Sequence, residues 1–86
     1  MRKFLFTPIA FEQYNDWQLE NEQVFSKPKK LIKEIGKTPF EGIGKPEALK
    51  YDYAGCWSRR ITDEHRLVYK IFDDHIEIIS CKFHYA

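Results

Sequence analysis

The sequence has few cysteines, almost no net charge and no long apolar run. Its two cysteines, Cys56 and Cys81, stand 25 positions apart without a Cys-x-x-Cys pair or a histidine cluster, so neither a disulfide framework nor a zinc site is indicated. The 14 basic and 13 acidic residues give a net charge of +1, which excludes a uniformly basic nucleic-acid binder. A basic surface could arise only if charges gather on one face. No run of about 18 apolar residues is present, so we expect no membrane span.

The length of 86 residues suits one small domain, and we expect a single domain over residues 1–86. A chain of this size has no room for a nucleotide-cofactor fold, and no motif indicates a metal or another cofactor. The apolar start at Lys3–Phe6 is interrupted by Pro8 and is not followed by a small-residue cleavage site, so it does not fit a signal peptide. We therefore expect a reducing, cytoplasmic location with both thiols free.

A short strand and a first helix are predicted at the start of the chain. The apolar segment Lys3–Phe6 forms the strand. The helix covers Pro8 to about Glu20, because Thr7 is a favourable N-cap and proline is favoured at the first helical position. Its buried stripe comprises Ala10, Tyr14 and Trp17.

A second helix is predicted from about Glu22 to Ile35, with Gly36 as its stop. Its apolar face comprises Val24, Phe25, Leu31, Ile32 and Ile35. Pro28 falls inside this pattern, where it removes a hydrogen bond and crowds the preceding turn. Two alternatives follow: the helix starts near Ser26, or it is kinked at the proline. The segment Gly36–Pro46, with three glycines and two prolines, is a loop.

From about Tyr53 the pattern changes to strands. The predicted strands are Trp57–Ile61, Leu67–Phe72 and Ile76–Phe83, with hairpin turns at 62–64 and 73–75. The order of one strand, two helices and at least three hairpin-connected strands predicts an α+β fold. We expect two helices packed on one face of a mostly antiparallel sheet of four to five strands.

Alternation along the last strand assigns its side chains to two faces. The set predicted to face the helix-covered core is Ile79, Cys81 and Phe83. The set predicted to face the open side is Ser80, Lys82 and His84. This pattern predicts an uncovered sheet face that becomes polar and basic towards the end of the chain, where a polyanion could lie.

Several polar side chains could contribute to such a face, but each has an ordinary explanation when taken alone. An exposed glutamate or lysine is commonly just solvated, and a strand arginine is commonly solvated or paired. The set comprises Glu47, Lys50, Arg59, Arg60, Arg66, Lys82, His84 and Tyr85. We expect His65 and Trp57 to be framework residues, and His75 to be a solvated turn residue.

Longer blocks of sequence give a more specific indication. They are Thr38–Glu47, Leu49–Lys50, Gly55–Ile61, Glu64–Tyr69 and the closing pair His84–Tyr85. In this order and spacing the chain resembles the YoeB/Txe branch of the RelE toxin superfamily, the ribosome-dependent mRNA endonucleases of bacterial toxin–antitoxin pairs. The blocks cover most of residues 38–85, whereas the first 37 residues agree mainly in helical pattern. The fold implied by the resemblance is RelE-like.

The resemblance implies a metal-free reaction in which the RNA's own 2′-hydroxyl attacks the adjacent phosphate. On this basis Glu47 is the general base, His84 is the general acid and Arg66 stabilises the phosphate. The matching substrate-binding residues are Lys50, Arg60, Lys82 and Tyr85. Arg59 is left outside this set, because alternation places it on the face opposite to Arg60.

The chain departs from the family pattern at several positions. Lys82 and Phe83 stand where Arg and Tyr are typical, which loses a fork-shaped donor and a hydroxyl. Gly36–Lys37 replaces a pair that is often basic. Pro28 interrupts the family's second helix, where it would affect antitoxin docking, and Ala86 adds a residue at the C-terminus.

The function implied by the resemblance is a toxin that enters the ribosomal decoding site, cleaves mRNA and stops translation. The expected partners are a cognate antitoxin, whose flexible segment covers the active face, and the 70S ribosome with its mRNA. The family also allows a homodimer. Two alternatives stay open: a ParE-like protein that inhibits a target such as DNA gyrase, and a catalytically inactive antitoxin partner or co-repressor. Glu47 and His84 argue against the first, and the residues alone do not separate the second from an active toxin.

Overall fold

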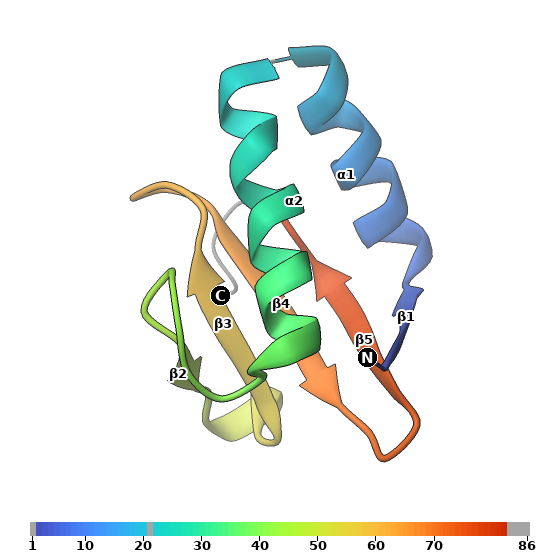
Figure 1. Ribbon diagram of the computed structural model, residues 1–86, viewed down its shortest axis with the longest axis vertical. Helices are drawn as coiled ribbons and strands as arrows, with labels where there is room; N and C mark the ends of the chain where they lie inside the picture. The colour runs from blue at the N-terminus through green and yellow to red at the C-terminus, as the bar shows by residue number, and fades with distance from the viewer. Residues whose placement is uncertain (1, 21, 83–86) are drawn as a thin grey trace.

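The computed structural model describes residues 2–20 and 22–82, and its two helices and four longer strands follow the predicted order (Figure 1). All its elements are β1 (Lys3–Phe6), α1 (Pro8–Glu20), α2 (Glu22–Lys37), β2 (Glu47–Ala48), the short 3-10 helix η1 (Tyr51–Tyr53), β3 (Cys56–Arg60), β4 (Arg66–Ile71) and β5 (His75–Ser80). The five-stranded sheet has the order β1-β5-β4-β3-β2. β1 is parallel to β5, and the other neighbouring pairs are antiparallel. Both helices cover one face of this sheet, which confirms the predicted α+β fold.

The first helix begins as the sequence predicts. Thr7 is its N-cap, because its Oγ1 accepts the backbone N–H of Ala10 at 3.1 Å. Ala10 and Trp17 are buried, and the half-buried Tyr14 packs against the same core. The ring of Tyr14 lies edge-on to that of Phe6, with centroids 5.4 Å apart, so the predicted stripe is confirmed.

The second helix extends further than predicted at its C-terminal end. It runs through Glu22–Lys37, so Gly36 lies in its last turn and does not end it. Of the two alternatives raised by Pro28, a start near Ser26 is wrong, because the helix already begins four residues earlier. The side chain of Pro28 is completely buried, and its burial offsets part of the lost backbone hydrogen bond. No helix in the described part of the chain is long and apolar enough to cross a membrane.

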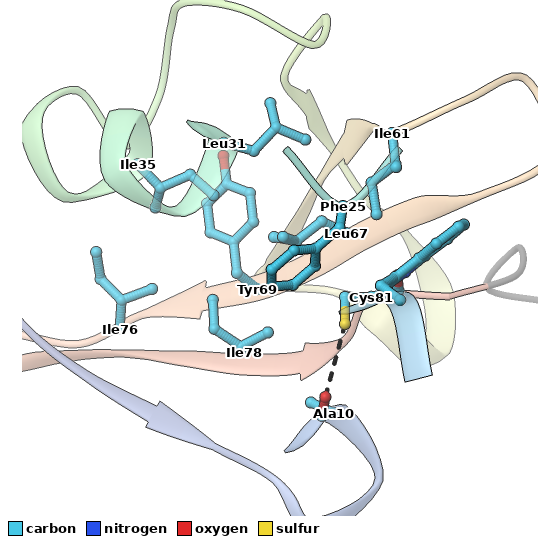
Figure 2. Packing of buried hydrophobic residues seen from close by; sticks show 11 residues of the cluster. Ala10, Phe25, Leu31, Ile35, Ile61, Leu67, Tyr69, Ile76, Ile78 and Cys81 are labelled. Carbon is cyan, nitrogen blue, oxygen red and sulfur yellow. Dashed lines mark hydrogen bonds between the residues drawn. The ribbon is translucent and has the colours of Figure 1, made fainter. Parts of the chain in front are cut away.

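The main core lies between the helix pair and the sheet (Figure 2). Leu31 and Ile35 of α2 belong to the same buried cluster as Tyr69 of β4. Ile76 and Ile78 of β5, two residues apart and therefore on one face, complete this part of the core. All five side chains are completely buried.

The opposite face of the sheet carries a smaller apolar cluster. It comprises the buried residues Leu49, Cys56 and Val68, with Tyr53 and Ile79 packed against them. Val68 lies between two residues of β4, Leu67 and Tyr69, that belong to the main core. Because alternate strand residues point to opposite faces, this second cluster occupies the face that the helices leave open.

A β-bulge in β5 explains why one expectation from alternation is wrong. Val68 pairs with Ser80, whereas the next residue, Tyr69, pairs with Ile78. Ile79 is therefore an extra residue on β5, so the alternation of side chains between the two faces shifts by one residue at this position. Ile79 packs on the open face and not in the helix-covered core as predicted.

After β5, helix α1 holds the chain through Cys81. The N–H of Cys81 donates to Oε1 of Gln13 at 2.8 Å, and its carbonyl accepts Nε1–H of Trp17 at 2.6 Å. Its Sγ donates to the carbonyl of Ala10 at 3.6 Å, the dashed line in Figure 2. Cys81 is completely buried in the main core, as predicted.

Candidate active site

Strand register brings three of the predicted site residues to the open face. Arg60 of β3 pairs directly with Arg66 of β4. Ser58, two residues before Arg60 and so on the same face, pairs with Glu47 of β2 on one side and with Val68 of the open-face cluster on the other. Glu47, Arg60 and Arg66 therefore share the face that the helices leave uncovered.

The separation of Glu47 and Arg66 suits a substrate phosphate between them. The two residues lie two strands apart and two positions apart along the strand direction. At ordinary sheet spacings their backbones are about 12 Å apart. Both side chains leave the same face of the sheet, so a phosphodiester bound over that face could contact both. A carboxylate and a guanidinium so placed can act as a general base and an anion holder.

The guanidinium groups of Arg60 and Arg66 are available to an anion. Like charges directly opposite one another across two strands are unfavourable. Within residues 2–20 and 22–82 neither arginine forms an ion pair with a carboxylate. Nη1 of Arg66 donates to the carbonyls of Thr62 at 2.7 Å, Asp63 at 2.9 Å and His65 at 3.2 Å. These bonds fix the guanidinium through one nitrogen, and its other donors can face a phosphate.

A depression of about 280 Å³ lies at the β2 edge of the sheet, and from Glu47 it extends away from the arginine pair, because Ala48 pairs with Trp57 and Leu49 bonds Cys56. It is lined by Glu47, Ala48, Leu49, Lys50 and Tyr51. The predicted base and one predicted substrate cation therefore line the same depression. The sequence did not predict β2, because a strand of two residues carries no alternation.

Arg59 points to the opposite side of β3 and is completely buried. Its Nε donates to Oη of Tyr69 at 3.1 Å. Its terminal nitrogens donate to the carbonyls of Thr38 at 2.5 Å, Glu41 at 2.9 Å and Ile43 at 3.3 Å. The side chain thus ties down the loop that leads to β2. Alternation predicts its direction, whereas no signal in the sequence identifies the carbonyls that it binds.

The same loop also positions Glu47 on the open face. Gly44 has φ +83°, and a Cβ there would lie 2.8 Å from Cδ2 of Leu31, so a larger residue would strain the backbone and displace Leu31 of α2. The carbonyl of Gly44 accepts the backbone N–H of Arg60 at 2.7 Å. Arg59 through its side chain and Arg60 through its backbone therefore both fix the loop just before Glu47.

Lys82 does not lie with the other predicted substrate-binding residues. Its Nζ is 2.6 Å from Oε2 of Glu20 and 5.4 Å from the centroid of the Trp17 ring. Its predicted place on the open face is therefore wrong. The chain leaves β5 after Ser80, and contacts with α1 then determine where the side chain goes.

The remaining part of the predicted site lies outside the described residues. It comprises His84 and Tyr85; Phe83, which was predicted to face the core, and Ala86 also lie outside the described residues. The structure shows what holds the preceding segment: the indole of Trp17 bonds the Cys81 carbonyl and packs edge-on against the ring of His65 at 4.8 Å. One side chain of α1 thus contacts both the segment after β5 and the turn that precedes Arg66. The expected framework role of His65 agrees with this contact.

The other two framework and turn residues differ in their surroundings. Trp57 packs against the main core, with its ring 5.2 Å from that of Phe40, as expected for a framework residue. His75 is less solvated than expected, because its ring stacks on Phe72 with centroids 4.5 Å apart. Its Nδ1 lies 2.7 Å from Oδ1 of Asp74, and this hydrogen bond lowers the pKa of the Asp74 carboxyl.

Both cysteines are free and buried. Burial raises the pKa of the Cys81 thiol to about 12. Burial also raises the pKa of Cys56, against the opposing effect of Lys70. Both thiols are therefore protonated at neutral pH and are poor nucleophiles.

Comparison with known proteins gives one consistent family. The family model described as a YoeB-like toxin of bacterial type II toxin-antitoxin system matches residues 6–85. The chain is 46% identical to Toxin YoeB of Escherichia coli (strain K12) over 83 residues, which is 96% of this chain and 99% of that protein. It is similar to a solved YoeB/ParE toxin from Agrobacterium tumefaciens, with a TM-score of 0.92, 44% identity and coverage of 96% and 99%. Two Staphylococcus aureus structures are also similar: a YoeB dimer (TM-score 0.89, 47% identity, 98% of each chain) and a YoeB-YefM complex (TM-score 0.88, 48% identity, 99% of each chain).

Proposed function

The chain belongs to the YoeB-like toxin family of bacterial type II toxin–antitoxin systems, and from this premise we propose that it is a ribosome-dependent endoribonuclease. In this proposal it acts in the cytoplasm, cleaves mRNA in the decoding site and thereby inhibits translation. The observation that carries the proposal is the opposed pair Arg60 and Arg66, which shares the open face with Glu47. Such a face can hold an RNA phosphate next to a general base.

The proposed reaction uses the nucleophile that RNA itself carries. Glu47 accepts the proton of the 2′-hydroxyl while the 2′-oxygen bonds to the adjacent phosphorus. The bond from phosphorus to the 5′-oxygen of the next nucleotide breaks, and His84 donates a proton to that oxygen. The products are a 2′,3′-cyclic phosphate and a 5′-hydroxyl. One proton is gained by Glu47 and one is lost by His84, so the step balances.

The proposed cations act on the phosphorane, whose oxygens carry more negative charge than those of the substrate. Arg66 is held in place by three backbone carbonyls, so little reorganisation is needed when the charge develops. Arg60 faces it across the strand pair, and Lys50 lines the depression with Glu47. Tyr85 completes the proposed substrate contacts, as the resemblance implies.

The charge of the chain supports a dependence on the ribosome. A net charge of +1 gives little non-specific attraction for free RNA. The ribosome would supply most of the binding and orient the message, which lowers the entropic part of the barrier. The proposed protein partner is an antitoxin, since a Staphylococcus aureus YoeB occurs in complex with YefM. A YoeB dimer from the same organism supports a homodimer as a further state.

Primer extension on an mRNA in a reconstituted translation reaction tests the proposal. The wild type should cut within translated codons, and only when ribosomes are present. Glu47→Gln keeps the size of the side chain and removes the base, so the cleavage rate should fall about 10²- to 10⁴-fold. Phe11→Ala, at an exposed position of α1, is the matched control and should cut like the wild type.

A second variant tests the acid. His84→Gln should lower the rate and remove the fall in rate that the wild type shows when the acid deprotonates at higher pH. Equal cleavage of free mRNA, or wild-type activity of Glu47→Gln, contradicts the proposal. If folded wild-type protein cuts nothing, an inactive partner or a ParE-like inhibitor is favoured, and DNA gyrase supercoiling becomes the next assay.

A further inference from the structure

Tyr51 is an exposed aromatic residue that the proposed reaction does not yet use. Its side chain is 92% exposed, the highest exposure among the large hydrophobic residues described. It lines the depression of about 280 Å³ together with Glu47 and Lys50. A ring this exposed gains almost nothing from the hydrophobic effect in the free protein, so packing does not account for a tyrosine here.

The backbone of Tyr51 is also unusual. Its φ is +58°, in the left-handed region that residues with a bulky side chain rarely adopt. The preceding residue, Lys50, is extended at φ −124° and ψ 174°, so the chain turns sharply between the two. The turn is closed by Ala54 N–H donating to the Tyr51 carbonyl at 3.0 Å. Glycine or asparagine would fit this conformation with less strain, so the tyrosine is not the residue that local stability favours.

We propose that Tyr51 stacks on a base of the single-stranded message next to the scissile phosphate. The inference rests on the proposed endoribonuclease function and assigns a substrate contact to it. Tyr51 lies on the side of Glu47 away from the arginine pair, because Ala48 and Leu49 pair with Trp57 and Cys56. A strand of RNA whose phosphate is held at Glu47 would place the neighbouring base on that side over the depression that Tyr51 lines. Stacking on an aromatic ring tolerates every base, because each base has a π-face. Tyr51 would therefore hold the message without imposing a codon preference.

Three substitutions at this position separate stacking from folding. Tyr51→Phe keeps the ring and should retain kcat/KM within about twofold. Tyr51→Ala should lower kcat/KM roughly 5- to 150-fold, the equivalent of one lost base–aromatic stack. Tyr51→Asn should lower it equally, although asparagine suits a positive φ and should leave the melting temperature unchanged or higher. A loss of activity in a variant that is at least as stable as the wild type excludes a folding defect.

An RNA variant completes the test. Short mRNAs on 70S ribosomes, each with one abasic nucleotide at a position flanking the cleaved bond, remove the base and keep the phosphate. Wild-type protein should cut the message that lacks the stacked base about as slowly as Tyr51→Ala cuts the intact message. Combining the two changes should cause little further loss, because both remove the same contact. Phe11→Ala removes another exposed aromatic residue, and its cleavage rate should fall on the abasic message as much as that of the wild type.

The outcomes distinguish this inference from the function on which it rests. If the wild type cuts no message, both proposals are overturned together. If the wild type cuts and Glu47→Gln does not, but Tyr51→Ala cuts like the wild type, only the stacking role is overturned. The stacking role is also overturned if, at every abasic position, the loss of cleavage rate caused by the missing base adds to the loss caused by Tyr51→Ala. The stacking role is supported if Tyr51→Ala cuts the intact message slowly and cuts one of the abasic messages no more slowly.

Discussion

Arg59 and Arg60 are neighbours in the chain, yet the two faces of the sheet use the same side chain in opposite ways. Arg59 is completely buried and donates to three carbonyls and a tyrosine hydroxyl. Arg60 is exposed, faces Arg66 and forms no ion pair with the described carboxylates. On the covered face the donors are satisfied within the protein. On the open face the arrangement is favourable only when an anion binds.

This difference separates stability from function along one strand. Three hydrogen bonds of Arg59 on the covered face go to carbonyls of the loop that leads to Glu47, so the covered face positions a residue of the candidate site. The open face keeps an unfavourable pair of like charges, which becomes favourable when an anion such as the proposed RNA substrate binds between them. Substitutions on the covered face should therefore change the free energy of unfolding, and those on the open face should change the proposed RNA cleavage.

The largest effect is expected from Arg59→Met. The substitution keeps much of the buried aliphatic stem but removes the donor from several buried acceptors, so the free energy of unfolding should fall by about 3 kcal/mol. Urea denaturation with a fixed m-value measures this loss. The matched control, Arg60→Met, makes the same change one residue later and should stay within about 0.5 kcal/mol of the wild type. Equal losses in the two variants would remove the distinction between the faces.

Local pattern was sufficient where the structure is regular. Alternation in β3 correctly predicts that Arg59 and Arg60 face opposite sides, because all five residues of that strand pair in one register. The Thr7 cap and the α1 stripe were likewise predictable, since both depend on residues within one or two turns. Glu47 was identified through the sequence blocks shared with the family, because its strand is too short to be recognised by alternation.

The failures arise where distant residues decide the conformation. The bulge at Ile79 depends on how β4 pairs with β5, and no period in β5 alone encodes it. Lys82 is placed by Glu20, more than sixty residues earlier in the chain, through a contact that only the folded arrangement creates. The carbonyl partners of Arg59 belong to a loop without periodicity. In each case tertiary contacts override the local pattern.

The next largest effect on the free energy of unfolding is expected at alkaline pH and comes from the Cys81 thiol, which is buried on the covered face. Because burial raises the pKa of Cys81 from 9.0 to about 12, the folded state binds its proton more tightly than the unfolded state. The associated stability is complete below pH 9 and is lost as the pH rises towards 12, of the order of 2 kcal/mol by about pH 11. Urea melts at about pH 8 and about pH 11 should show a smaller loss for Cys81→Ala than for the wild type. Equal losses would contradict the assignment.

A smaller effect is expected from the hydroxyl that Arg59 contacts. Oη of Tyr69 accepts from Arg59 and donates to the carbonyl of Pro39 at 2.8 Å. Tyr69→Phe keeps the ring and removes both bonds, so stability should fall by about 1 kcal/mol, measured by urea denaturation. Double substitution with Arg59→Met should lose less than the sum of the two single losses, because the residues share one network. Strict additivity would show that the hydroxyl acts independently of the arginine.

The smallest effect on stability should have the opposite sign. Arg60→Glu places a carboxylate opposite Arg66 and converts a repulsive cross-strand pair into an attractive one. The free energy of unfolding should rise by about 0.2–1 kcal/mol at low salt, and the gain should shrink as salt screens the pair. Ribosome-dependent cleavage should fall at least tenfold, since the new carboxylate occupies Arg66 and repels phosphate. Arg60→Ala removes the repulsion without adding attraction, so its gain should be smaller. A more stable but less active protein is expected only if the opposed arginines serve to bind the substrate. A loss of stability in Arg60→Glu would instead show that the charges of the open face, like those of the covered face, are already satisfied within the protein.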